Sequence, residues 1–281
     1  MAEILPIDRG EWPGFVRRTI PGQTGALSVR IGGPADGPPV LFAHSILTDG
    51  AIWARQATQL AAQGFRVVVA DTSGHGSSEA AAAPYTLADL GADVIAVLDG
   101  LSIDRAHFVG VSLGGMTGLG LGIDHADRLL SLCVCAARAD APAPFAAAWD
   151  DRIALARDTS TEALAGPTIA RWFGDAFVAN APSMVDLLTA CVAGTSTEGF
   201  VGCARAIQGL DYLDEVGQIR VPTALVIGTN DEALLAPMRA LAPLIPGATY
   251  AEIANGGHLP QVDQPGRFDA VLIAHLASVG R

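Results

Sequence analysis

The chain has 281 residues and a formal net charge of −12; half of its residues are hydrophobic and only 16% are charged. A net negative charge of this size argues against anionic partners, so we expect neither nucleic acid nor an anionic membrane surface to bind. The low charged fraction leaves an excess of apolar surface. That excess predicts either an apolar ligand pocket or a self-association patch. A self-association patch would make the protein a homo-oligomer.

No apolar run reaches the ~18 residues that a membrane span requires, and the N-terminus lacks the basic start and apolar centre of a signal peptide. The four cysteines follow neither a disulfide framework nor a metal-binding spacing, and no His/Asp/Glu cluster suggests a metal. They are Cys133, Cys135, Cys191 and Cys203. We therefore expect a cytoplasmic protein with free thiols, no metal and no cofactor.

Short apolar runs alternate along the chain with helical stretches, which predicts one α/β domain with a mostly parallel sheet and helices on both faces. The predicted strands are Leu27–Ile31, Val40–Phe42, Arg66–Ala70, Ala106–Val111, Leu130–Ala136, Thr223–Ile227 and Thr249–Ile253. The predicted helices are Trp53–Gln63, Leu87–Leu101, Leu113–Ile123, Ala233–Leu244 and Gln264–Ala277.

Residues 139–206 break this alternation, because they are rich in alanine, helix-like and free of any strand pattern. An insertion at this place would lie over one edge of the sheet as a lid. We therefore divide the chain into a core of residues 1–138 and 207–281 and a helical lid of residues 139–206. The lid's aromatic residues either line a substrate cavity or form the lid's own core. They are Phe145, Trp149, Trp172, Phe173 and Phe177.

Ser112 stands in the segment Gly110-Val111-Ser112-Leu113-Gly114, directly after a predicted strand and before a predicted helix. A serine on such a sharp turn presents its hydroxyl at the helix N-terminus, and small neighbours are needed because strand and helix backbones come close. This pattern is the nucleophile elbow of the α/β-hydrolases. The alternative is an ordinary turn with a helix-capping serine.

An elbow serine needs a base and an acid, which follow it in the order Ser, Asp or Glu, His. Asp231 follows the strand Thr223–Ile227, and His258 follows Thr249–Ile253 on a loop with two glycines. We predict a triad of Ser112, Asp231 and His258. Asp231 could instead be a helix N-cap, and His258 a surface loop histidine. The backbone N–H groups of Leu113 and Ile46 are predicted to form the oxyanion hole.

With these motifs in order, the chain resembles α/β-hydrolases, and within them 3-oxoadipate enol-lactonases. The matching segments are His44–Asp49 with Trp53, Gly110–Met116, and Arg171-Trp172-Phe173 in the lid. The resemblance implies ring opening of a small carboxylated lactone, as in aromatic catabolism. Those enzymes usually carry Asn and Gly in the oxyanion loop, where this chain has His44 and no glycine.

The sequence thus predicts a serine hydrolase that cleaves a carboxylic ester or lactone through an acyl-enzyme. Arg171 and Trp172 are predicted to contact the substrate, Arg171 either as a carboxylate anchor or as a solvated or structural charge of the lid. One alternative function is cleavage of a C–C bond in a ring-fission product. The other is a non-catalytic ligand receptor on a hydrolase scaffold.

Overall fold

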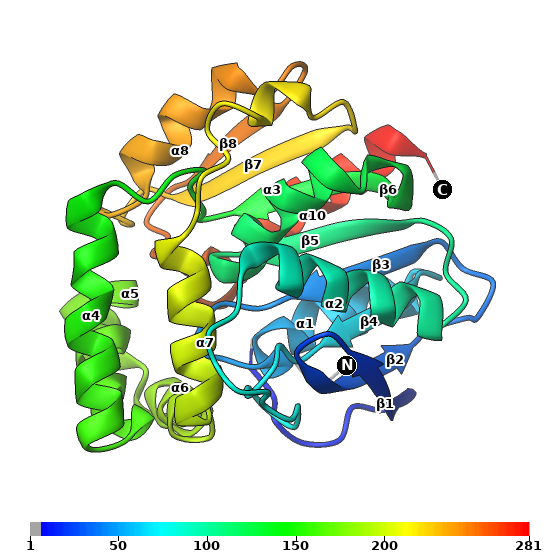
Figure 1. Ribbon diagram of the computed structural model, residues 1–281. Coiled ribbons are helices and arrows are strands. Elements are labelled where there is room, and N and C mark those ends of the chain that lie inside the picture. The colour runs from blue at the N-terminus through cyan, green and yellow to red at the C-terminus, as the bar shows by residue number, and fades with distance from the viewer. Residues whose placement is uncertain (1–6, 281) are drawn as a thin grey trace.

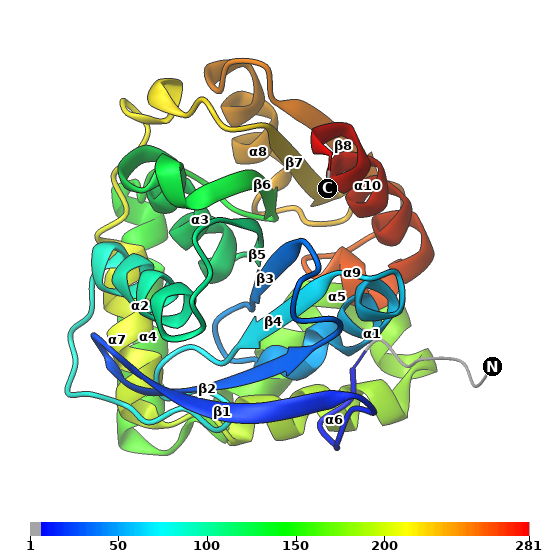
Figure 2. The same ribbon diagram turned by 90° about the vertical axis from the view of Figure 1, so that its right-hand side faces the viewer.

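The computed structural model describes residues 7–280 and contains an eight-stranded sheet in the order β1-β2-β4-β3-β5-β6-β7-β8 (Figures 1 and 2). Strands β3 to β8 run parallel to one another, whereas β1 and β2 form an antiparallel hairpin that also pairs antiparallel with β4. The strands are β1 Phe15–Gly22, β2 Gly25–Gly32, β3 Pro39–Ala43, β4 Arg66–Ala70, β5 Ala106–Val111, β6 Leu129–Cys135, β7 Thr223–Gly228 and β8 Thr249–Ile253.

Helices cover both faces of the sheet, with α2 and α3 on one side and α1 and α10 on the other (Figure 2). This two-sided cover explains why the central strands are continuous apolar runs, since every residue of β5 and of β7 is buried. The helices outside the insertion are α1 Ala54–Ala62, α2 Leu87–Gly100, α3 Leu113–Asp124, α8 Leu235–Leu241, α9 Pro260–Asp263 and α10 Pro265–Val279.

Four helices between β6 and β7 stand beside the sheet, at the left of Figure 1 in green to yellow. We call them the cap: α4 Ala143–Asp158, α5 Ala165–Asn180, α6 Pro182–Ala193 and α7 Thr197–Gln208. The cap packs on the carboxyl-terminal ends of the parallel strands. Helix α7 is held close to the core. The Ser196 N–H, just before the helix, donates to the Gly74 carbonyl at 2.7 Å, and a Cβ on Gly74 would overlap Gly199.

The predicted strands agree with the structure to within two residues at each end, and the hairpin strand β1 was not predicted. In β1 only Ile20 is fully buried and most other positions are exposed, so the strand lacks the apolar run that marks the others. The predicted helix Ala233–Leu244 is shorter, because α8 ends at Leu241. Pro243 follows, and its missing N–H cannot continue the helical ladder.

The four cysteines are free and buried, and burial raises the pKa of Cys133 to about 12. Within residues 7–280 no single helix is long and apolar enough to cross a membrane, although α6 and α7 pass the same test as a pair bent by 91°. No group of three or more metal-ligating side chains gathers in the same residues.

Candidate active site

Ser112 lies at the turn from β5 into α3, and its backbone φ is 56°, a positive value that few non-glycine residues adopt. The turn is tight enough that a Cβ on Gly110 would overlap the carbonyl of Gly114, and one on Gly114 would overlap the carbonyl of Ala43. The Ser112 N–H donates to the Cys135 carbonyl at 2.8 Å. Its hydroxyl makes no capping hydrogen bond, so the serine is not there to cap the helix.

Asp231 and His258 meet at the same edge of the sheet, beyond the ends of β7 and β8. The two strands are parallel neighbours, so the residues that follow them emerge side by side. His258 Nδ1 and Asp231 Oδ2 are 2.7 Å apart in a buried hydrogen bond. The other carboxylate oxygen, Oδ1, accepts from the Leu234 N–H at 3.2 Å. Asp231 therefore both orients the imidazole and caps the turn that follows it.

The charge state of Asp231 is set by opposing effects. Burial alone would raise the pKa of its carboxyl group, but His258 and the backbone N–H groups of Leu234 and Ala233 lower that pKa below its usual value. Asp231 is therefore ionised at neutral pH and accepts the Nδ1 proton of His258. This leaves His258 Nε2 as the basic atom.

Ser112 stands at the end of β5, two strands away from β7 in the same parallel sheet, so all three residues emerge at one edge. Among the hydrogen bonds of residues 7–280, none joins the Ser112 hydroxyl to His258.

The segment after β3 forms a compact loop that faces the start of α3. His44 shapes it with both ring nitrogens: Nδ1 lies 2.8 Å from the Ser45 carbonyl, and Nε2 accepts from the Thr72 N–H at 2.8 Å. In the second contact the ring acts as an acceptor through Nε2. The His44 carbonyl accepts the Gly114 N–H at 3.1 Å and ties this loop to α3.

The two predicted oxyanion donors lie at this junction. Within the described residues, neither the Ile46 N–H nor the Leu113 N–H donates to a backbone or side-chain acceptor. Both residues are buried, and buried N–H groups without a partner are rare in proteins. Two such groups beside the Ser112 turn are available to an oxygen atom of a bound molecule.

The sequence matches the α/β-hydrolase fold family over residues 38–265. The chain belongs to the α/β-hydrolases. The 3-oxoadipate enol-lactonase 1 of Acinetobacter baylyi is 31% identical over 253 residues, which cover 90% of this chain and 94% of that relative. The putative carbamate hydrolase RutD of Variovorax paradoxus is 32% identical over 262 residues, covering 90% of this chain and 97% of the relative.

Among solved structures, the crystal structure of the enol-lactonase from Burkholderia xenovorans LB400 superposes with a TM-score of 0.86 at 33% identity, covering 90% of this chain and 97% of that one. The predicted fold class is thereby confirmed, and so is the predicted likeness to enol-lactonases. The similarity runs through the cap as well as the core. The protein is an α/β-hydrolase enzyme whose relatives include lactone hydrolases.

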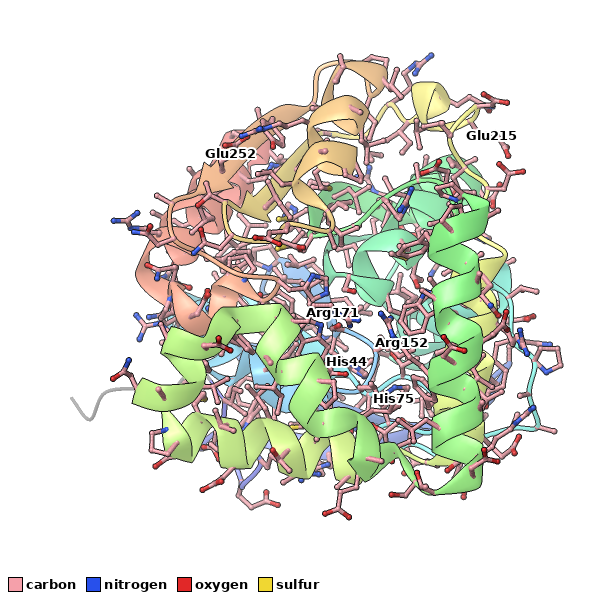
Figure 3. All side chains as sticks on the ribbon, turned by 90° about the vertical axis from the view of Figure 1, so that its left-hand side faces the viewer. His44, His75, Arg152, Arg171, Glu215 and Glu252 are labelled. Carbon is pink, nitrogen blue, oxygen red and sulfur yellow. The ribbon has the colours of Figure 1, made fainter. Side chains whose placement is uncertain are left out.

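Two arginines of this hydrolase reach inward from the cap. Arg152 on α4 and Arg171 on α5 extend toward the same space, with His44 and His75 below it (Figure 3). Neither guanidinium forms an ion pair within residues 7–280. Arg152 rests on the Trp149 ring, 4.6 Å from its centre, which fixes its direction.

The surroundings of Arg171 are unusual for a residue with an exposed side chain. Crowding by protein atoms and the like charge of Arg152 lower the pKa of Arg171 to about 10, and Asp231 acts in the opposite direction. It is fully charged at neutral pH. The charges of Arg152 and Asp231 therefore both act on Arg171. Both predicted roles, a carboxylate anchor and a solvated or structural charge of the lid, stay predictions.

Sequence reasoning missed Arg152. A usable signal was present, because Trp149 and Arg152 are three residues apart and such pairs lie on one face of a helix. The signal was weak, since the orientation of that face toward the core depends on how the cap docks.

The aromatic residues of the cap divide between two roles. Phe173 and Phe177 stack on each other with ring centres 4.3 Å apart, and Trp149 packs against Phe145 and Phe200. Trp172 instead stacks on the His258 imidazole, with ring centres 5.7 Å apart and an angle of 21° between the planes. Most of the set is packing of the cap, and Trp172 is the member that reaches the candidate base.

Proposed function

We propose that this hydrolase opens a lactone, or cleaves an ester, that carries a carboxylate, with Ser112 as the nucleophile. The observation that carries the proposal is a pair of guanidiniums, those of Arg152 and Arg171, which have no ion-pair partner among the described residues and extend toward one space near His44 and His75 (Figure 3). The chain is acidic overall, with a formal charge of −12, yet no carboxylate of the described residues pairs with these two groups. Two like charges held together favour an anion between them.

The chemical steps follow from the positions of the groups. His258 Nε2 takes the Ser112 proton as the hydroxyl oxygen attacks the acyl carbon. Asp231 keeps the imidazole in the required tautomer and stabilises its positive charge. The Ile46 and Leu113 N–H groups receive the oxyanion. The C–O bond to the alkoxide breaks, His258 protonates that oxygen, and water repeats the sequence on the acyl-enzyme.

A lactone is favoured over a simple ester by the relatives, two of which are named enol-lactonases. In a lactone the leaving alkoxide stays attached to the acyl group, so ring opening gives a single molecule. Arginines that bind a carboxylate on the ring would therefore hold the whole opened product in the site. Another relative is named a putative carbamate hydrolase, so carbamates are a competing substrate class for this protein.

The test compares matched substrates on matched variants. We expect the wild type to prefer a γ-lactone with a carboxymethyl group over the neutral γ-lactone and over a simple carbamate. Arg171→Ala should raise KM for the carboxylated lactone about 10- to 100-fold, since a charged bidentate contact contributes about 1.5–3 kcal/mol. Turnover of p-nitrophenyl acetate should stay close to that of the wild type.

Arg157→Ala is the control, because Arg157 is an exposed arginine on the same cap and should change neither substrate. Equal losses on the charged and neutral substrates in Arg171→Ala would contradict the carboxylate contact. A wild type with no preference for the carboxylated lactone would contradict the proposed substrate.

A further inference from the structure

Three of the hydrogen bonds that fix the loop carrying His258 involve Gly256, Gly257 and His258. The Asn230 N–H donates to the Gly256 carbonyl at 2.8 Å, and the Gly257 N–H donates to Asp263 Oδ2 at 2.7 Å. Both of these partners belong to the core. The third contact comes from the cap, because the N–H of His258 itself donates to the Trp172 carbonyl at 2.8 Å.

The Trp172 carbonyl is free to accept this bond because helix α5 is interrupted. Gly174 has φ 75° and ψ 166° in the middle of the helix, values open to glycine and costly for other residues. A break of this kind ends the ladder of helical hydrogen bonds, and the carbonyls of the turn before it lose their partners as at any helix end. Trp172 stands two residues before the break.

The side chain of the same residue adds a second contact. Trp172 is 3% exposed, and its indole lies nearly parallel to the His258 ring. The backbones are also in close contact, since a Cβ on Gly257 would overlap the Trp172 carbonyl oxygen. One cap residue therefore holds the candidate base by its main chain and limits the tilt of its ring.

We propose that Trp172 is a positioning residue for His258, so that the base is aligned only while the first half of α5 is docked on the core. Substrate entry past the cap and activation of Ser112 are thereby coupled. This inference rests on the proposed triad, and it does not depend on the carboxylated substrate. It differs from a substrate contact because it acts on every substrate, including one too small to reach the cap.

The experiment uses p-nitrophenyl acetate and the variants Trp172→Ala and Trp172→Phe. We expect Trp172→Ala to lower kcat about 10²-fold with little change in KM, the size of loss that follows from misplacing a reacting group by about 1 Å. The rate at which a small fluorophosphonate labels Ser112 should fall by a similar factor. Trp172→Phe retains a flat ring and the same carbonyl, and should recover most of both rates.

Gly257→Ala provides a second route if Trp172→Ala does not fold. Its methyl group would push the Trp172 carbonyl away without changing the chemical identity of any catalytic side chain, and kcat should again fall with KM little changed. Circular dichroism and thermal melting establish that each variant is folded. Unchanged kcat and labelling rates in folded Trp172→Ala or Gly257→Ala would overturn the proposal, as would a loss confined to KM.

Failure of the proposed role of Trp172 can be distinguished from failure of the proposed function. If Ser112→Ala still hydrolyses p-nitrophenyl acetate at the wild-type rate, the triad itself is wrong. If only the preference for carboxylated lactones is missing, the substrate assignment fails and the role of Trp172 is still measured.

Discussion

The core and the cap differ in whether the charged groups at the candidate site have protein partners. At the sheet edge two buried carboxylates have protein partners: Asp231 accepts from His258 and from the Leu234 N–H, and Asp71 accepts the N–H groups of Gly50 and Ser77. The cap presents Arg152 and Arg171 without a carboxylate. A satisfied network holds a fixed geometry, whereas unpaired guanidiniums keep their binding capacity for a ligand. Under the proposed function, the core supplies the reaction and the cap supplies the choice of substrate.

The largest expected effect comes from the core. Ser112→Ala should lower kcat by about four to six orders of magnitude, or about 5–8 kcal/mol in barrier, because no other group can form the acyl-enzyme. The fold should persist, since the hydroxyl makes no helix-capping hydrogen bond. Burst kinetics with p-nitrophenyl acetate and mass spectrometry of fluorophosphonate-treated protein measure both points. Labelling of a residue other than Ser112 would contradict the assignment of Ser112 as the nucleophile.

Asp231→Asn should come next, with a loss in kcat of about 10³- to 10⁴-fold, because the amide no longer enforces the tautomer of His258 that leaves Nε2 basic. The asparagine oxygen can still accept the Leu234 N–H, so thermal stability should change little. Asp231→Ala is the matched comparison, which also removes that cap and should cost about 1 kcal/mol of folding free energy. A fully active Asp231→Asn enzyme would leave Asp231 as a helix cap alone.

The core and the cap should also differ in how much a lost aromatic side chain lowers the free energy of unfolding. Phe108→Ala, at a residue of β5 that is 1% exposed, should cost about 3–5 kcal/mol of unfolding free energy because the cavity cannot close in a packed sheet. Phe177→Ala in the cap removes a half-buried ring and its stacking on Phe173, and should cost about 1 kcal/mol. Urea denaturation of both variants tests the order. Similar losses would mean that cap and core are equally well packed.

The smallest effect concerns Asp263, where burial raises the pKa of the carboxyl group well above its usual value, to about 6. The folded protein holds this proton more tightly than the unfolded chain, so stability falls as pH rises from about 4 to 6 and stays lower above that. Asp263→Asn removes the charge but weakens the bond to the Gly257 N–H. We expect a net gain of about 1 kcal/mol at pH 7.

Denaturation at several pH values provides the control for Asp263→Asn. The two proteins should have nearly equal stability near pH 4, and their difference should develop only between pH 4 and 6. A difference that is constant with pH would assign the effect to packing.

The residues that were predictable from sequence are those whose function requires a local pattern. Ser112 needs glycines on both sides, Asp231 follows a buried strand and His258 follows the next strand on a loop with two glycines, so spacing and order pointed to all three. Their burial and the 2.7 Å contact between Asp231 and His258 depend on the sheet order, which places β7 beside β8. Parallel strands with alternating helices made that arrangement predictable in outline.

Contacts between distant segments were not predictable. The bond from His258 to the Trp172 carbonyl involves backbone atoms, which every residue has, so no side-chain pattern marks it. Arg152 and Arg171 extend toward the same space only because of how α4 packs on α7 and α5 on α6. Strand β1 was missed for a different reason, since an edge strand exposed on most of its length lacks the apolar run on which strand prediction depends.

The close contact between Gly74 and Gly199 has a practical consequence for engineering. Two glycine backbones pressed together, with the Ser196 N–H bonded across the junction, leave no room for a side chain and fix helix α7 to the core. Exchange of cap segments between relatives should therefore replace α4 to α6 and retain α7 of the recipient. Such chimeras would change the groups that face the substrate and keep the junction through which the cap is attached.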